Sequence, residues 1–490
     1  MKIPFVTTLM RLSPIRRQSI TQLGFTLLVT LVGFISTMLF SHLLGKDLLG
    51  VYYLFLTYFS IFNLIGDGGF GGAAVKKISE GKDQDAYFTA YMTLRTILII
   101  VSTVILLAIE PLFVDLADYH LVPLIITALV IAYFSNALSA GIRAKNHVGI
   151  FNAASGISEL VRIGISIILV LIGFSVYGMI GGFFVGCALA GLLCIKYFRY
   201  RPAKFTRDHI RELLSFSLWG LLMGSASLIM GYADTIFIGY FMENGDVGVY
   251  RVALNFTTAS IFIANAVNST LAPKISNWSA NGKIDEIPPV VARSFTYGLI
   301  LAIPVAVGGF LLADELLYYF YGADFAAGAV SACILFLFQI MSVFLLFIGT
   351  ALFDSGHPRN SFYGTLAAVI LNVILDILLI PLFGINGAAL GSLCAAIINV
   401  LIVTHELKKF MPVFVEKKPV LHILLAALLM GAAVLVYTLI VPMSNVVLVL
   451  LPVAFGGILY FVLLLKFDKG IHDDIRDVVT NFGLPWPKRL

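Results

Sequence analysis

The chain is a series of long apolar runs separated by short polar turns. Most runs approach or exceed the roughly 20 residues that a helix needs to cross the hydrocarbon of a bilayer. The predicted spans cover residues 20–45, 48–71, 88–109, 121–140, 151–173, 176–197, 213–241, 247–272, 291–312, 327–353, 361–382, 386–404, 420–441 and 445–465. The pattern therefore predicts an all-α membrane protein with fourteen transmembrane helices.

Composition agrees with this pattern. Of the 490 residues, 60% are hydrophobic and only 12% are charged, whereas globular proteins contain about 25% charged residues. The polar stretches are too short to fold a soluble domain. The four cysteines all lie inside apolar spans without histidine neighbours, so we interpret them as packing residues and expect no metal site and no cofactor.

The basic residues predict the orientation of the chain. Of the 32 lysines and arginines, all but four lie in the N-terminal segment, in loops after even-numbered spans, or in the C-terminal tail. The four exceptions are Arg95, Arg162 and Arg251 within spans, and Lys46 in an odd-numbered loop. Because positive charges are retained on the cytoplasmic side, we expect cytoplasmic termini and a location in the cell membrane (inner or plasma membrane). No nucleic-acid-binding motif accompanies the net charge of +5.

Two short repeats indicate an internal duplication. Gly50-Val51-Tyr52 recurs as Gly248-Val249-Tyr250, 198 residues later, and Lys77-Ile78-Ser79 recurs as Lys274-Ile275-Ser276, 197 residues later. Two tripeptides nearly in register at opposite ends of one span predict two parallel six-helix halves. The predicted parts are an N-lobe at 1–198, a basic cytoplasmic linker at 199–212, a C-lobe at 213–410, and residues 411–490 with the last two spans and the tail.

Ionisable residues inside spans are the candidates for a binding site, because a charge at the bilayer centre costs roughly 3 kcal/mol. Glu159 and Arg162 lie three residues apart and can pair on one helix face, as a structural pair or as part of a transport site. Arg95 lies about two turns inside its span, where it can extend to the interface or face a cavity.

Near the outer face, Arg251 follows Tyr250, where it can bind a phosphate through two hydrogen bonds or anchor the helix at the interface. Asp234 and Asp376 are candidate carriers of a coupling cation; for Asp376 the alternative is a structural contact between helices. No paired carboxylates or nucleophile arrangement predicts an enzyme.

Glycines and prolines predict where spans end or bend. Gly68 and Gly69, directly after Asp67, predict a turn where the second span leaves the membrane, and Pro304 and Pro381 predict bending points.

In these features the chain resembles the polysaccharide (O-antigen type) flippases of the multidrug/oligosaccharidyl-lipid/polysaccharide exporter superfamily. The resemblance covers nearly the full length. It is carried by the two repeats, by Asp67-Gly-Gly69 and Ala272-Pro-Lys274, and by Gly356-His-Pro-Arg359 with Asn372, Leu379-Ile-Pro381 and Phe383-Gly-Ile-Asn-Gly-Ala-Ala389.

The resemblance implies two six-helix lobes around a central cavity and alternating access that moves a polyprenyl-linked oligosaccharide from the cytoplasmic to the outer leaflet. It implies that cavity arginines, here Arg95, Arg162 and Arg251, contact the diphosphate and that the last two helices hold the lipid tail. From Asp234 and Asp376 we expect H⁺ or Na⁺ as the coupling ion. Other polysaccharide-biosynthesis proteins are further partners. One departure is that the three arginines within spans are accompanied by four acids there: Asp67, Glu159, Asp234 and Asp376.

Two other classes of function stay open at this point. A cation-coupled multidrug antiporter of the same superfamily needs an acid deep in the N-lobe, where the first span offers only His42. A membrane glycosyltransferase or polymerase needs a catalytic acid or long external loops, and the longest predicted external loop is the short segment 110–120. A scaffold without transport is a further alternative.

Overall fold

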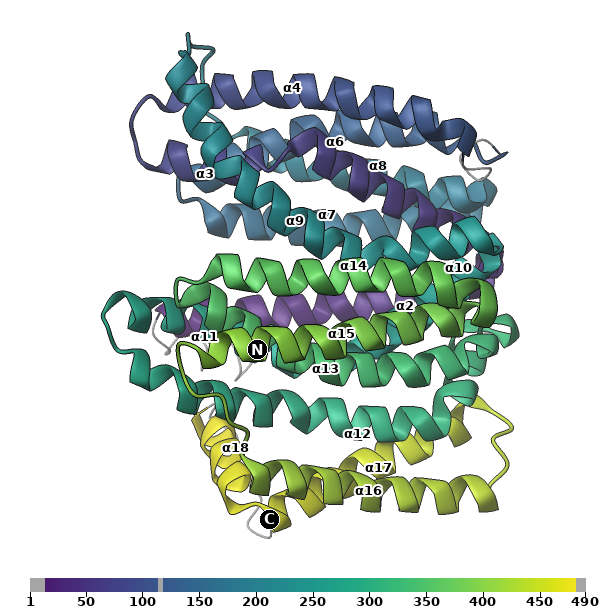
Figure 1. Ribbon diagram of the computed structural model, residues 1–490. Coiled ribbons are helices and arrows are strands. Elements are labelled where there is room, and N and C mark those ends of the chain that lie inside the picture. The colour runs from purple at the N-terminus through teal and green to yellow at the C-terminus, as the bar shows by residue number, and fades with distance from the viewer. Residues whose placement is uncertain (1–13, 113–117, 482–490) are drawn as a thin grey trace, which may run out of the picture. The chain divides into compact units, whose positions relative to one another are not determined.

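The computed structural model describes residues 14–112 and 118–481, and within these ranges the regular structure is helical (Figure 1). The first thirteen residues of the predicted N-lobe and the last nine of the predicted tail lie outside the described residues.

The helices follow one another with short connections. They are α2 (Pro14–Asp67), α3 (Phe70–Ser79), α4 (Gln84–Ile109), α6 (Leu121–Ala144), α7 (Val148–Leu169), α8 (Ser175–Ile195), α9 (Arg207–Phe241), α10 (Asn244–Thr257), α11 (Phe262–Ala280), α12 (Ile287–Tyr321), α13 (Ala329–Asp354), α14 (Pro358–Phe383), α15 (Ile385–Lys408), α16 (Lys417–Ile440), α17 (Val446–Phe467) and α18 (Lys469–Asn481). A five-residue π-helical segment, Val170–Phe174, joins α7 to α8.

Twelve helical stretches in the described part of the chain are long and apolar enough to cross a membrane, so this is a multi-pass membrane protein. The two longest, Leu27–Asp67 with 41 residues and Val148–Ile195 with 48, exceed what one crossing needs. A straight helix of 41 residues is about 60 Å long, against about 30 Å of hydrocarbon. Each stretch is interrupted at a glycine with positive φ, Gly45 (φ 74°) and Gly173 (φ 103°).

Glycines also determine two helix ends. α2 ends at Asp67, and Gly68 (φ 58°) and Gly69 (φ 74°) turn the chain before α3 begins, as the sequence predicts. A left-handed backbone is accessible to glycine at little cost. α14 runs through Pro381 and ends at Phe383, directly before Gly384 (φ 59°). A proline inside a helix removes one backbone hydrogen bond and favours a kink, so the bend at Pro381 stays a prediction.

The chain divides into two compact units, each described here by itself. The first comprises residues 14–25, 252–375 and 385–481, and the second comprises 26–112, 118–251 and 376–384. This division follows packing, whereas the predicted lobes follow the duplication, so the lobes remain a prediction. Because α9 begins at Arg207, residues 207–212 of the predicted linker are helical.

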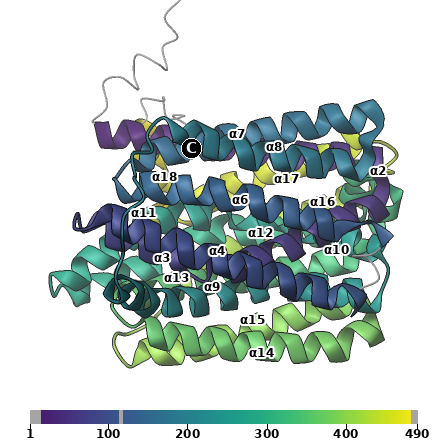
Figure 2. The same cartoon turned by 90° about the horizontal axis from the view of Figure 1, so that it is seen from above.

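In the second unit α7 packs on α8, α8 on α6, and α3 on α4, α6 and α9 (Figure 2). In the first unit α12 packs against α11, α13, α16 and α17. The core of that unit includes Phe295 and Phe347, and the buried Tyr460 hydroxyl donates to the carbonyl of Ile300 at 2.7 Å. α18 is attached to α12 through the ion pair between Arg293 and Asp474.

Candidate transport site

All seven residues that the sequence nominates for binding or coupling lie in the second unit. They come from five helices: Arg95 from α4, Glu159 and Arg162 from α7, Asp234 from α9, Tyr250 and Arg251 from α10, and Asp376 from α14. Packing brings five of them together as two groups: Arg162 with Glu159, and Asp234 with Asp376 and Tyr250. Arg251 lies beside the second group, and Arg95 lies apart from both.

The two copies of the repeated tripeptide pack against each other. A Cβ placed on Gly50 would lie 1.7 Å from the carbonyl oxygen of Asn244, and one placed on Gly248 would lie 2.1 Å from the carbonyl oxygen of Lys46. Each glycine therefore lets the backbone of the other copy approach closely, which no larger residue permits. α2 and α10 meet here in a reciprocal contact.

Arg162 forms the centre of the first group. Its guanidinium pairs with the carboxylate of Glu159 through Nε (2.8 Å) and Nη2, as the spacing on one helix face predicts. Its Nη1 donates to the Tyr52 hydroxyl at 3.0 Å. A Cβ on Gly186 of α8 would lie 2.7 Å from the Cβ of Arg162, so a glycine there lets α8 approach α7 at the arginine. The side chains stay 24% and 37% exposed for Arg162 and Glu159, which leaves them accessible to a ligand.

Arg251 differs because no carboxylate pairs with it in the described residues. Its guanidinium lies over the rings of Tyr232 (5.0 Å to the centroid) and Tyr53 (5.6 Å), and Nη1 donates to the Gly231 carbonyl at 3.1 Å and to Thr235 at 3.5 Å. Its Nε is buried without a hydrogen-bond partner among the described residues. Tyrosine faces stabilise a cation without neutralising it, so this positive charge remains available to an anion.

Asp234 and Asp376 form the second group. The Tyr250 hydroxyl donates to the Asp234 carboxylate, and the carboxyl groups of Asp234 and Asp376 are hydrogen-bonded to each other. Both side chains are buried, Asp376 completely. Two carboxyl groups can share a hydrogen bond only when one carries a proton, because an ionised carboxylate only accepts. The pair can therefore hold one proton, or a cation in its place.

Arg95 is fully enclosed. Its Nε lies 3.8 Å from an oxygen of Asp67, and its Nη1 donates to the Tyr91 hydroxyl at 2.9 Å and to the Tyr133 carbonyl at 3.3 Å. Asp67 in turn accepts from the backbone of Gly71 at 3.2 Å. Arg95 does not extend to the interface, and its contacts tie α4 to α6 and to the turn between α2 and α3.

Three aromatic residues complete these groups without having been nominated from the sequence: Tyr52, Tyr53 and Tyr232. A signal for Tyr52 existed, since it occupies the position in the first repeat that Tyr250 occupies in the second. Tyr53 and Tyr232 carry no such signal, because an aromatic residue near a span end is ordinarily an interfacial anchor.

Comparisons with known proteins identify the class of the protein. The chain belongs to the polysaccharide biosynthesis protein family, whose profile matches residues 39–329. This agrees with the resemblance to polysaccharide flippases of the exporter superfamily. The relatives include two proteins of Haloferax volcanii, the probable low-salt glycan biosynthesis flippase Agl15 (24% identical, 89% of this chain and 92% of the relative) and the probable flippase AglR (24%, 96% and 99%). These relatives are named as transporters rather than enzymes.

The fold agrees with that of solved transporters. A lipid II flippase MurJ in an inward closed conformation superposes with a TM-score of 0.79 at 18% identity, over 92% of this chain and 99% of that one. An inward-facing multidrug resistance MATE family transporter superposes with a TM-score of 0.60 at 17% identity, over 80% and 100%. At these identities the likeness concerns the fold alone.

Proposed function

We propose that this protein is a flippase that moves a polyprenyl-linked oligosaccharide from the cytoplasmic to the outer leaflet of the cell membrane by alternating access. The task is to carry a polar, anionic head through ~30 Å of hydrocarbon while the lipid tail stays in the bilayer. Membership in the polysaccharide biosynthesis family and relatives named as glycan flippases support the cargo class.

The observation that carries the proposal is Arg251. An arginine inside a membrane span normally pairs with an acid, yet this one has a buried Nε without a hydrogen-bond partner and no carboxylate pairing with it among the described residues. A diphosphate offers the oxygens that a guanidinium binds through two hydrogen bonds. Arg251 is therefore our candidate for the group that contacts the cargo diphosphate.

Arg162 is the second cationic group of the proposed site. Its partial exposure leaves the guanidinium within reach of a ligand, while Glu159 and Tyr52 fix its direction. We propose that the Arg162–Glu159 pair contacts the sugar hydroxyls or the phosphate when the cargo enters. The enclosure of Arg95 makes it the least suited of the three arginines, and we assign it a structural role at the turn after α2.

For alternating access, we propose that the reciprocal Gly50–Gly248 contact is the point where the two halves meet on the outer side. The contact is backbone against backbone, so it can separate and re-form without rearranging side chains. We also propose fourteen crossings, with the 41- and 48-residue stretches each crossing twice, on either side of Gly45 and Gly173.

The buried Asp234–Asp376 pair is the proposed site of the coupling cation, H⁺ or Na⁺. A hydrogen bond between its two carboxyl groups requires one proton, and Tyr250 adds a hydroxyl oxygen beside them. Releasing the proton leaves two like charges in a buried site, which is unfavourable unless a cation replaces it. An H⁺ or Na⁺ gradient across the membrane can therefore favour one conformation over the other by loading or emptying this pair.

A leaflet-translocation assay tests the proposal. The full-length protein is placed in liposomes with a tagged polyprenyl-diphosphate oligosaccharide, and the outward-facing fraction is measured over time. A hydrogen bond to a charged group contributes about 1.5–3 kcal/mol, so we expect Arg251→Ala to slow translocation at least about tenfold. Arg251→Lys should keep part of the rate, because it retains the charge and loses the planar fork.

The matched control is Arg476→Ala, an exposed arginine on α18, which should behave as wild type. Equal rates for Arg251→Ala and wild type would remove Arg251 from the site. Gradient-driven export of a fluorescent aromatic cation by liposomes that do not flip the glycolipid would favour the multidrug antiporter instead.

A further inference from the structure

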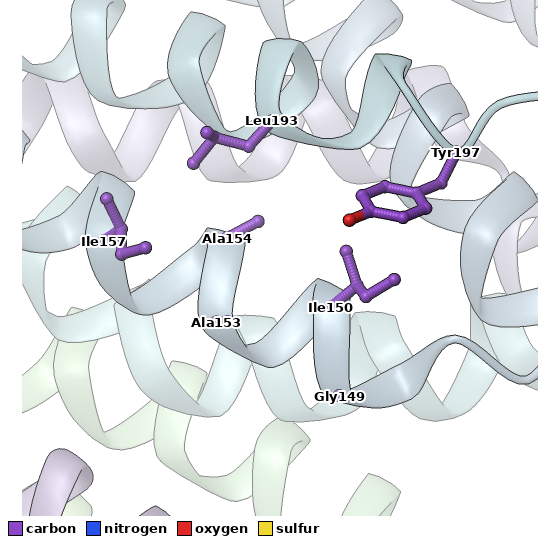
Figure 3. Close-up of a pocket in the computed structure, with 7 residues that line it drawn as sticks. All are labelled: Gly149, Ile150, Ala153, Ala154, Ile157, Leu193 and Tyr197. Carbon is purple, nitrogen blue, oxygen red and sulfur yellow. The ribbon is translucent and has the colours of Figure 1, made fainter.

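A shallow cavity of about 340 Å³ lies between α7 and α8 near the start of α7 and the end of α8 (Figure 3). It is lined by Ile150, Ala153, Ala154, Ile157 and Leu193, of which Ala154 is buried and Ala153 is exposed. Tyr197 closes one end, and its hydroxyl points into the cavity in Figure 3. The lining is apolar except for this hydroxyl.

The groove lies where α7 presents the small side chains of Ala153 and Ala154 between Ile150 and Ile157. Further along the helices, glycines at 182 and 186 of α8 let the two backbones approach closely. At the groove the buried Ala154 packs on Ile142 and Cys194, which closes the floor. Ile157, Leu193 and Tyr197 are exposed, so the groove opens outward and accepts a ligand only from that side.

The surface around the groove is suited to hydrocarbon. Near the groove Leu192 and Ile195 of α8 are more than half exposed, as are Ile168 of α7 and Leu171 of the π-helical segment further along. In a chain that spans a membrane, an apolar surface of this kind is covered by lipid. The groove is therefore a depression in a surface that lipid chains contact, and an extended chain can enter it from the side.

The Tyr197 end of the groove is basic. Lys196 and Arg199 are exposed on either side of the lining tyrosine, and the ring of the exposed His147 lies 6.2 Å from the Tyr197 ring. The flanking segments 143–151 and 192–201 contain no aspartate or glutamate. The Lys145 ammonium donates to the Arg199 carbonyl at 3.2 Å, which holds this part of the chain in place. These charges complement an anionic head group next to an apolar chain.

We infer that this groove binds an anionic lipid of the bilayer, with one hydrocarbon chain between α7 and α8 and its phosphate against Lys196, Arg199 and His147. The distribution of basic residues predicts that this end is cytoplasmic, where anionic head groups are concentrated. A resident lipid fits better than the long anchor of a cargo, because 340 Å³ is at the low end of ligand cavities, about 300–1,000 Å³. The inference does not depend on the proposed function, since binding is measured without transport.

The test is a titration of the full-length protein in detergent with phosphatidylglycerol, followed by native mass spectrometry. Phosphatidylcholine with the same chains is the head-group control. Ala153→Trp fills the groove from an exposed position, and Lys196→Ala with Arg199→Ala removes the charges. We expect each change to weaken phosphatidylglycerol binding by about tenfold or more, since each basic residue near an anionic head group contributes several-fold. Photoactivatable phosphatidylglycerol should label peptides from α7 and α8.

Two matched variants separate this site from general lipid contact. Ile168→Trp enlarges an exposed side chain elsewhere on α7, and Lys274→Ala with Lys283→Ala removes two exposed cations from another predicted cytoplasmic loop; both should bind as wild type. Wild-type affinity in Ala153→Trp, equal binding of phosphatidylcholine, or labelling elsewhere would overturn the inference. Binding of polyprenyl phosphate about tenfold tighter than phosphatidylglycerol would overturn the choice of a resident lipid.

Discussion

The two copies of the Gly-Val-Tyr repeat have the same backbone role and different chemistry. Gly50 and Gly248 each accept the backbone of the other copy. Two residues later the copies differ: Tyr52 accepts a hydrogen bond from the Arg162 guanidinium, whereas Tyr250 donates one to the Asp234 carboxylate. A hydroxyl can do either, because it is both donor and acceptor.

We propose that the repeated element divides two tasks between its copies. The contact that requires glycine is retained in both copies, because a Cβ at either position meets a carbonyl oxygen. The tyrosines retain their place and meet partners of opposite charge, one beside the Arg162–Glu159 pair and one beside the Asp234–Asp376 pair. We therefore expect changes in the first copy to affect the anionic cargo, and changes in the second to affect the coupling cation.

The largest effect is expected at the glycines. Gly50→Ala and Gly248→Ala each force a methyl group against a carbonyl oxygen, and overpacking of this kind costs about 1–3 kcal/mol or more. Thermal unfolding in detergent should show both variants destabilised to a similar degree. Gly164→Ala is the control, because a Cβ there meets nothing within 4 Å. If one variant is destabilised much more than the other, the two glycines do not make equivalent contacts.

Next in size is the effect of Asp376→Asn on coupling. Asparagine can still hydrogen-bond Asp234 but cannot bind or release the proton, so the fold should persist while the response to the gradient is lost. Translocation driven by a pH or Na⁺ gradient should fall about tenfold toward the rate without a gradient. Asp324→Asn, in an exposed loop, is the control. Full gradient dependence in Asp376→Asn would separate the carboxyl pair from coupling.

A smaller change in stability and cargo binding is expected when the Arg162–Glu159 pair is broken. Arg162→Ala leaves Glu159 without its partner, but this carboxylate is 37% exposed and, in the hydrated transport site that we propose, water screens it. We expect a loss of stability of about 1 kcal/mol or less, together with weaker binding of the anionic glycolipid. Glu159→Gln should bind the glycolipid at least as well as wild type, because the positive charge is then uncompensated. Weaker binding in both variants would mean that the pair acts as a neutral unit.

The smallest effects are expected at the two repeat tyrosines, and they test the difference between the two copies most directly. Tyr52→Phe and Tyr250→Phe each remove one hydroxyl, with an expected cost of about 1 kcal/mol. Tyr52→Phe should raise the glycolipid concentration for half-maximal transport, and Tyr250→Phe should shift the cation concentration for half-maximal transport. Measuring both quantities in both variants gives a two-by-two test. If both variants change the same quantity, the division of tasks between the repeats is wrong.

Part of the site was open to prediction from the sequence. The spacing of Glu159 and Arg162 predicts their pairing, which forms, and the glycines after Asp67 predict the end of α2, which is observed. Both depend on local geometry, since residues three apart on a helix are neighbours and glycine readily adopts positive φ. The bend expected at Pro381 stays a prediction, since α14 runs through this proline and ends directly before Gly384.

By itself the sequence determined the membrane class, the helical character and the superfamily, and it predicts two related halves, because these depend on composition and on neighbours along one chain segment. Only the tertiary structure decided that Gly50 meets Gly248, that Asp234 meets Asp376, and that Arg95 is enclosed while Arg251 has no carboxylate partner among the described residues. Those outcomes depend on how each helix is rotated and packed against helices distant in the sequence. An apolar helix in a membrane carries little hydrophobic pattern to fix that rotation, so close packing of small residues and polar contacts fix it instead.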